Sequence, residues 1–414
     1  MAQHDTLKKI PVSELRLGMH LHHFEAAWID HPFWRTRFTL SDPADLASIA
    51  ASSVRECWID VSQGADVTAP PTGPAVAPQR TRGVTRPRTA PPAARRTALA
   101  PTDLGNELDR AAALCRRSKD AVTSMFNEAR LGKAIDAEHC RPLVNDIAES
   151  VYRNPGALVS LARLKTADDY SYMHSVAVCA LMVSLGRTLG LSESQCKEGG
   201  LAGLLHDMGK ALMPADILNK PGKLSDEEFA VMRSHPERGH AMLVEGGGAS
   251  DAVLDVCLHH HEKVDSSGYP HRLAGDAISL FARMGAVCDV YDAITSNRPY
   301  KAGWDPAESI ARMASWQGHF DADVFSAFVK SLGIYPTGSL VRLATGRLAV
   351  VLEQNAQSLT TPVVKVFFST QTNLPIEARR LDLAKSNDRI TGRESRTEWS
   401  FPQIEALWCG DHAR

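Results

Sequence analysis

A histidine followed directly by an aspartate, at the end of an apolar helical run, constrains this chain more than any other feature. The pair is His206-Asp207, within residues 203–210 (GLLHDMGK). It offers one imidazole nitrogen and one carboxylate to the same point, a mixture of ligands that borderline divalent metals favour. A single pair of this kind arises by chance in many long chains, so its meaning depends on the other residues that the chain brings to it.

Further imidazole and carboxylate groups lie on apolar helical runs in the same part of the chain. A lone histidine on an apolar helix face is more often a hydrogen-bonded core residue than a ligand. Several such groups within one predicted helical domain favour a metal site instead. They are His174, His235, His260, His261, Asp289 and Asp292.

Composition restricts the remaining choices. The chain has 414 residues, with 44% hydrophobic and 23% charged residues, which is ordinary for a soluble protein of two or more domains. A net charge of −2 predicts neither a nucleic-acid nor a membrane-surface partner. No apolar run approaches the ~18 residues of a membrane span, and the start lacks the apolar core of a signal peptide. Eight scattered cysteines without a CxxC pair suit reduced thiols, so we expect a cytoplasmic protein.

Changes in composition and in hydrophobic periodicity along the chain predict five regions and a mainly α fold. Short alternating segments predict a small mixed domain over residues 1–65. Residues 66–102 are rich in proline, alanine and arginine, which predicts a solvated linker. Helical periodicity predicts a helical connector over 103–149 and successive helices over 150–335. Short apolar runs separated by turns predict a small β-rich region over 336–414.

The order of the histidines and aspartates resembles the HD-GYP family, a branch of the HD phosphohydrolases. Three further segments carry the resemblance: residues 260–270 (HHEKVDSSGYP), 217–224 (ILNKPGKL) and 296–301 (SNRPYK). The resemblance covers roughly residues 150–335 and implies an all-helical, metal-dependent phosphohydrolase domain. Residues 1–65 more weakly resemble a small domain of unclear role that often precedes HD-GYP domains.

The resemblance also implies a pair of divalent metals with Asp207 between them. His174, His206 and Asp289 would complete the ligands of one ion, and His235, His260 and His261 those of the other. The family favours Fe or Mn, and Zn remains open for such ligands. Two ions ~3.5–4 Å apart can activate a hydroxide and clamp a phosphodiester.

The implied substrate is cyclic di-GMP, hydrolysed to linear pGpG, with onward cleavage to GMP left open. Asp207 and Lys210 would be catalytic, and Lys210, Arg298 and Lys301 would bind the phosphates. One alternative is a catalytically weak receptor that binds cyclic di-GMP or docks diguanylate cyclases. Another is a phosphodiesterase for a different cyclic dinucleotide.

Two residues depart from the family pattern. Tyr170 stands where members proposed to hold a third metal carry glutamate, so we expect two metals and pGpG as the product. Ser266 stands where glycine is usual, and serine resists backbone angles that glycine accepts. The neighbouring loop Gly268-Tyr269-Pro270 is a candidate docking surface for GGDEF-type cyclases. The sequence leaves the input signal and the oligomeric state open.

Overall fold

The computed structural model separates the chain into two compact units, Met1–Ala98 and Leu99–Arg414. The residues it describes are 6–24, 38–41, 43, 46, 49, 55–67, 104–164, 170–297, 303–355, 357–396, 398–399, 401 and 403–413. Most of the linker expected over 66–102 therefore lies outside the described residues. So do Arg298, Lys301 and the side chain of Tyr170.

The first unit is built on a four-stranded antiparallel sheet in the order β1-β4-β2-β3. Its strands are β1 (Leu7–Pro11), β2 (His20–Phe24), β3 (Phe38–Thr39) and β4 (Glu56–Asp60). β1 pairs with β4 along its whole length. Alternate β4 residues, Cys57 and Ile59, are buried against Ile10, Met19 and Leu21, as a strand with one core-facing side requires.

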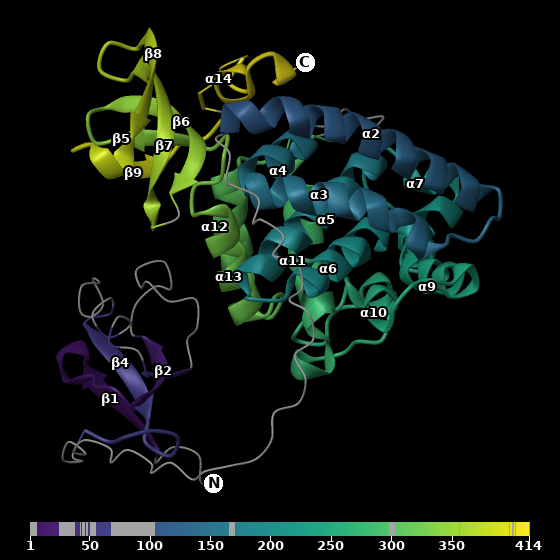
Figure 1. The fold of residues 1–414 in the computed structure, drawn as a ribbon, viewed down its shortest axis with the longest axis horizontal. Coiled ribbons are helices and arrows are strands. Elements are labelled where there is room, and N and C mark those ends of the chain that lie inside the picture. Colours follow the sequence, from purple (N-terminus) through teal and green to yellow (C-terminus); the bar gives the residue numbers. More distant parts are fainter. Residues whose placement is uncertain are drawn as a thin grey trace, which may run out of the picture. The chain divides into compact units, whose positions relative to one another are not determined.

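The second unit is mainly helical (Figure 1). Short 3₁₀ turns, among them η4 (Met208–Leu212), separate several of its helices. The helices are α2 (Leu104–Arg130), α3 (Arg141–Arg153), α4 (Pro155–Arg163), α5 (Tyr170–Thr188), α6 (Glu193–Leu205), α7 (Ala215–Leu218), α8 (Asp226–Met232), α9 (His235–Gly246), α10 (Asp251–His259), α11 (Leu280–Thr295), α12 (Pro306–Ser315), α13 (Ala322–Leu332) and α14 (Ala406–Cys409).

Helix α5 forms the centre of this unit. Its side chains from Met173 to Leu185 are buried, because the helix is apolar on every face and is surrounded by α4, α6, α11 and α13. A Cβ atom at Gly203 of α6 would lie 2.9 Å from Cγ of Met182 and 3.0 Å from the carbonyl oxygen of Val178. The absence of a side chain at this position lets α6 approach α5 closely and brings the end of α6 to the start of α5.

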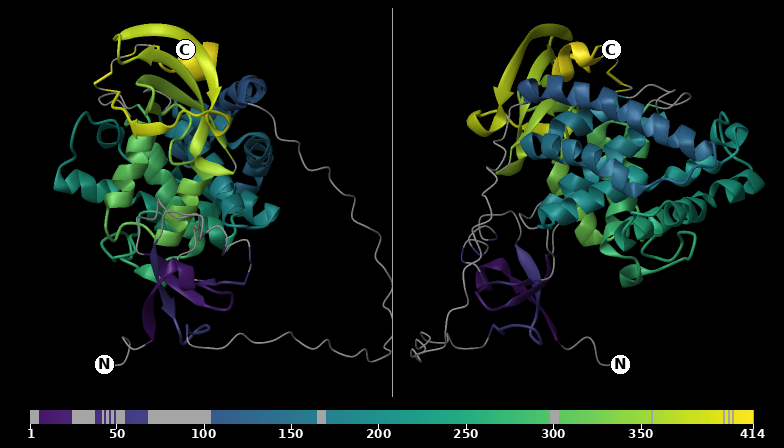
Figure 2. Two further views of the ribbon diagram at one scale, coloured as in Figure 1. Left: turned by 90° about the vertical axis from the view of Figure 1, so that its left-hand side faces the viewer. Right: turned by 45° about the vertical axis from the view of Figure 1, so that its right-hand side comes forward.

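A five-stranded antiparallel sheet follows the helices, in the order β8-β7-β6-β5-β9. Its strands are β5 (Leu340–Leu343), β6 (Arg347–Asn355), β7 (Ser358–Ser369), β8 (Leu374–Asp382) and β9 (Ile390–Arg393). Val341, Val351 and Val364 belong to its core. Figure 2 shows this sheet at one end of the helical body, beside α2. The mainly α fold with a β-rich C-terminal region is thus confirmed, and no described helix is long and apolar enough to cross a bilayer.

Candidate metal centre

The candidate site forms where the ends of several helices meet. α6 ends at Leu205, His206 is its C-terminal cap, and η4 begins directly after Asp207. A Cβ atom at Gly209 would lie 1.9 Å from the carbonyl oxygen of His235, the first residue of α9. Only glycine permits so close an approach of η4 to α9, and this approach places Asp207 beside His235.

One group of side chains combines residues from α5, from the turn between α6 and η4, and from α11. His174, His206, Asp207 and Asp289 each place a potential ligand atom within 4.8 Å of the others, and all four are buried. Nε2 of His174 lies 3.0 Å from Oδ1 of Asp289 and 3.4 Å from Oδ2 of Asp207. Nε2 of His206 lies 3.4 Å from the same Asp207 oxygen. Two imidazole nitrogens and two carboxylates therefore converge on one point.

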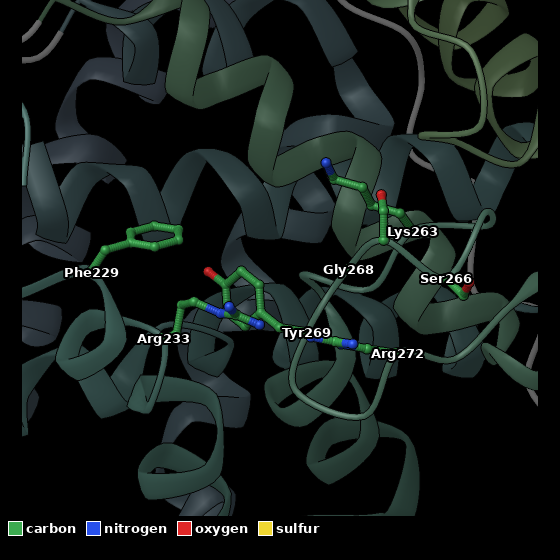
Figure 3. Close-up of a pocket in the computed structure, with 8 residues that line it drawn as sticks. Phe229, Arg233, Lys263, Ser266, Gly268, Tyr269 and Arg272 are labelled. Carbon is green, nitrogen blue, oxygen red and sulfur yellow. The ribbon is translucent and has the colours of Figure 1, made fainter. Parts of the chain in front are cut away.

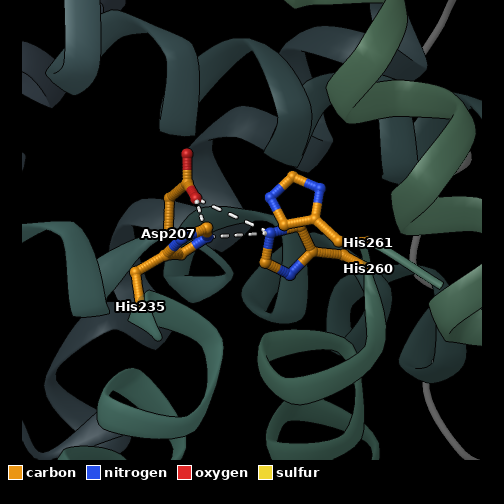
Figure 4. A group of neighbouring side chains, drawn as sticks. All are labelled: Asp207, His235, His260 and His261. Atoms are coloured by element: carbon orange, nitrogen blue, oxygen red, sulfur yellow. Dashed lines mark hydrogen bonds and ion pairs between the residues drawn. The ribbon is translucent and has the colours of Figure 1, made fainter. Parts of the chain in front are cut away.

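A second group shares Asp207 with the first and takes its histidines from α9 and the end of α10 (Figure 4). Nε2 of His235 lies 3.2 Å from Oδ1 of Asp207, and Nε2 of His260 lies 3.6 Å from the same oxygen. His261 completes the group and retains 21% side-chain exposure. Asp207 thus directs Oδ2 towards the first group and Oδ1 towards the second, which is the arrangement of a carboxylate that bridges two cations.

The Nδ1 atoms of four histidines are already engaged. Those of His206, His235 and His260 donate to the backbone carbonyls of Gly203 (2.7 Å), Met232 (2.8 Å) and Val256 (3.0 Å), since a carbonyl can only accept. Nδ1 of His174 lies 2.7 Å from Oδ2 of Asp292. Such contacts fix the ring orientation and leave each Nε2 lone pair facing the cluster, as in metal-binding histidines.

Two buried atoms at the centre of the cluster test whether the residues fit a metal. Nε2 of His206 and Oδ1 of Asp207 have no hydrogen-bond partner among the described residues. Leaving buried polar atoms unsatisfied costs about 1–3 kcal/mol each, and a cation would satisfy both. The donor set of imidazole nitrogens and carboxylates suits borderline divalent ions. The residues present therefore fit a dinuclear site.

Electrostatics keep the carboxylates of the cluster ionised. Burial favours the neutral form of Asp207, but the charges of Lys210 and His206 outweigh it and hold the pKa of Asp207 well below its usual range. Burial is likewise outweighed at Asp289, where the contacts with His174 and His206 hold the pKa of the carboxyl far below normal. Both side chains are thus in the charge state that a metal ligand requires.

The histidines of the cluster differ in the direction of their pKa shifts. Burial lowers the pKa of His260 to about 4 and that of His261 well below its usual value, so both rings are neutral at pH 7. Burial also opposes the charge on His174, but hydrogen bonds with Asp207, Asp289 and Asp292 raise its pKa to about 10. Without a cation, the surrounding carboxylates therefore retain a proton on His174, and an ion bound there would replace it.

Lys210 forms an ion pair with Asp207. It lies on η4, and its Nζ donates to Oδ2 of Asp207 at 2.5 Å while the side chain keeps 22% exposure. The ammonium group thus contacts the cluster while the side chain remains partly exposed to solvent.

The loop after His261 borders the cluster. Tyr269 stacks on His261 with ring centroids 4.7 Å apart, and the Tyr269-Pro270 peptide bond is cis. The buried carboxylate of Glu262 accepts from the backbone N–H groups of His271 (2.7 Å) and Leu273 (3.0 Å), which fixes the loop. Ser266 has a φ of 66°, the left-handed conformation that glycine adopts more easily, so the loop carries serine in a conformation suited to glycine.

The structure brings together all seven residues expected as metal ligands. Sequence reasoning counted Asp292 among the groups that favour a metal site but gave it no place in either set of ligands, whereas the structure places it against Nδ1 of His174. It also missed a pocket of about 450 Å³ beside the cluster, lined in part by Phe229, Arg233, Lys263, Tyr269 and Arg272 (Figure 3). Lys263 and Tyr269 lie in the segment 260–270 that carries the family resemblance, but nothing in the sequence around Phe229, Arg233 and Arg272 distinguishes these three residues from a solvated surface.

Comparison with known families gives two matches. The HD domain family matches residues 142–324, which include all seven residues of the cluster. A domain of unknown function, DUF3391, matches residues 7–140. The second match extends from the N-terminal sheet through the long helix α2, and so crosses the boundary between the two compact units.

Comparison with curated proteins gives one relative that matches nearly the whole chain and others that match part of it. A cyclic di-GMP phosphodiesterase of Pseudomonas aeruginosa is 54% identical over 98% of this chain and 96% of its own length. The cyclic di-GMP phosphodiesterase response regulator RpfG of Xanthomonas campestris is 37% identical over 41% of this chain and 47% of its own. A 3'3'-cGAMP-specific phosphodiesterase of Vibrio cholerae is 37% identical over 39% of this chain and 38% of its own. Together with the HD-domain match and the His-Asp cluster, this similarity shows that the chain belongs to the HD-GYP family of HD-domain phosphohydrolases.

Proposed function

We propose that this protein is a phosphodiesterase that hydrolyses cyclic di-GMP to linear pGpG. The observation that carries the proposal is the position of Asp207, whose two carboxylate oxygens face two separate groups of ligand-type side chains. The similarity to a cyclic di-GMP phosphodiesterase over 98% of the chain supports this choice of substrate. A receptor that only binds the nucleotide would not need both groups.

Two divalent ions, Fe or Mn in the first place and Zn as the alternative, fit the two groups. His174, His206 and Asp289 would hold one, His235, His260 and His261 the other, and Asp207 both. Ions bound in this way would supply Lewis acidity and a nucleophile at neutral pH.

The chain's own residues would orient the phosphodiester and balance its charge. Lys210, within reach of both Asp207 and the solvent, would stabilise negative charge that develops on the phosphate. Arg298 and Lys301 are proposed to bind the phosphates, Arg298 through a bidentate contact. The substitution of Tyr170 for the glutamate of three-metal members supports pGpG rather than GMP as the main product.

The test is the turnover of cyclic di-GMP by anaerobically purified protein, with the metal content measured on the same sample. The double variant His206→Ala, Asp207→Ala serves as the blank. We expect cleavage to pGpG by the metal-loaded protein and none by the variant. Accumulation mainly of GMP would contradict the proposed end product. Bound metal and tight nucleotide binding without turnover would favour the receptor alternative, in which the loop Gly268-Tyr269-Pro270 would dock GGDEF-type cyclases.

A further inference from the structure

The pocket beside the metal cluster has an unusual lining. Phe229, Arg233, Lys263, Tyr269 and Arg272 contribute three cations and two aromatic rings, and none of its lining residues is acidic. Figure 3 shows Arg233 and Arg272 extending towards Tyr269 from opposite sides of the pocket. Its volume of about 450 Å³ is within the usual range for small-molecule sites. A planar, electron-rich ligand attached to an anionic group fits this lining.

Arg233 is held in place by aromatic rings. Its guanidinium carbon lies 4.7 Å from the ring centroid of Tyr269 and 5.9 Å from that of Phe229. Within the described part of the chain, the guanidinium forms no ion pair or hydrogen bond with another side chain. Stacking thus orients the guanidinium and leaves its N–H groups available. Such an arginine can donate two hydrogen bonds to one ligand without first losing another partner.

Phe229 and Tyr269 supply the surfaces on which a base can stack. Phe229 is 47% exposed, which leaves much of a large apolar ring open to solvent. Its ring centroid lies 6.5 Å from that of Tyr269, with the rings nearly perpendicular. Stacking of a nucleobase on such rings contributes about 1–3 kcal/mol by alanine substitution.

The pocket adjoins the cluster. The ring of Tyr269 stacks on His261, Arg233 precedes His235 by two residues, and Lys263 follows His261 by two residues. A nucleotide whose phosphate lies at the cluster would therefore have its base within reach of this pocket.

We propose that this pocket is a guanine subsite and that Arg233 determines specificity for guanine over adenine, an inference that rests on the phosphodiesterase function proposed above. The guanidinium donates two hydrogen bonds to O6 and N7 of the base. Adenine presents an N6 amino group where guanine presents O6, so two donors would face each other. Lys263 and Arg272 add positive potential for the attached phosphate.

The test compares two substrates in the metal-loaded full-length protein. The specificity ratio is kcat/KM for cyclic di-GMP divided by kcat/KM for cyclic di-AMP. Glutamine pairs with N6 and N7 of adenine, so Arg233→Gln should lower this ratio by about ten-fold to a hundred-fold, mainly through a higher KM for cyclic di-GMP. The control is Arg187→Gln, because Arg187 lies 5.6 Å over the ring of Tyr152 at the far end of α5 and should leave the ratio unchanged.

The outcomes separate the two proposals. If Arg233→Gln lowers kcat/KM equally for both substrates, the ratio is unchanged. Arg233 would then contact phosphate or only support the fold, and the guanine subsite would be overturned. A wild-type protein that holds metal but cleaves neither dinucleotide would overturn the phosphodiesterase proposal and this inference with it.

Discussion

Nδ1 of His174 lies 2.7 Å from Oδ2 of Asp292, one turn of α11 beyond Asp289. The same helix thus supplies one acid to the His-Asp cluster and a second acid that orients a histidine of that cluster. Asp292 is buried, and its other oxygen accepts from the Ser296 hydroxyl at 3.2 Å.

Substitution of Asp292 should therefore weaken metal binding without removing a ligand. We expect Asp292→Asn to lower metal affinity by about 10–100-fold, because the amide that replaces the carboxylate carries no charge and orients the ring of His174 and raises its basicity less. Titration of metal-free protein with Mn²⁺ measures this. Asp255→Asn is the matched control, since Asp255 makes a similar 2.7 Å contact to His259, which is outside the cluster. Equal effects of the two substitutions would contradict the orienting role.

Substitution of Asp207 and of Asp289 should remove different numbers of metal ions. Asp207 faces both groups of ligands and Asp289 belongs to one. We expect Asp207→Asn to lose both ions and Asp289→Asn to retain about one per chain, from about two in the wild type. Elemental analysis after gel filtration gives the ratio. Loss of a single ion from Asp207→Asn would show that this carboxylate does not bridge.

The ligand cluster could be predicted from the sequence, whereas its surroundings could not. His206-Asp207 and the other ligands are residue types with few alternative uses on apolar helices, so their chemistry is visible along the chain. Arg233 and Arg272 are ordinary surface residues in sequence, and only the loop after His261 brings them to one pocket. The close approach of η4 to α9 depends on Gly209, one of 28 glycines, and only the fold distinguishes it.

The pH dependence of stability should include a contribution from His319. Burial, followed by the positive charge of Lys263, lowers the pKa of His319 to about 4. The unfolded chain, with a histidine pKa of about 6.5, binds this proton first. The free energy of unfolding therefore falls as the pH drops from about 6.5 to about 4.

Replacement of His319 with glutamine removes this contribution. The thermal midpoint should fall less between pH 7 and pH 5 in His319→Gln than in the wild type. Parallel decreases in the two proteins would show that His319 titrates normally.

Asp305 should stabilise the junction between the helices and the C-terminal sheet. Its Oδ1 accepts from the N–H of Ala307 at 2.9 Å and caps α12, while Oδ2 accepts from Leu340 of β5 at 3.2 Å. Asp305→Ala loses a helix cap and leaves a buried N–H unsatisfied, so we expect a cost of about 2–3 kcal/mol. Urea unfolding measures it. Asp276→Ala removes a fully exposed partner of Arg283 and should cost much less than Asp305→Ala, because solvent screens an exposed ion pair. Similar costs for the two variants would contradict this assignment.

The most direct test of the dinuclear site is anomalous diffraction from crystals grown with the metal that supports turnover. A dinuclear site should give two peaks about 3.5–4 Å apart. One should lie among His174, His206 and Asp289, the other among His235, His260 and His261, with the Asp207 carboxylate between them. A single peak, or a pair that Asp207 does not join, would contradict it.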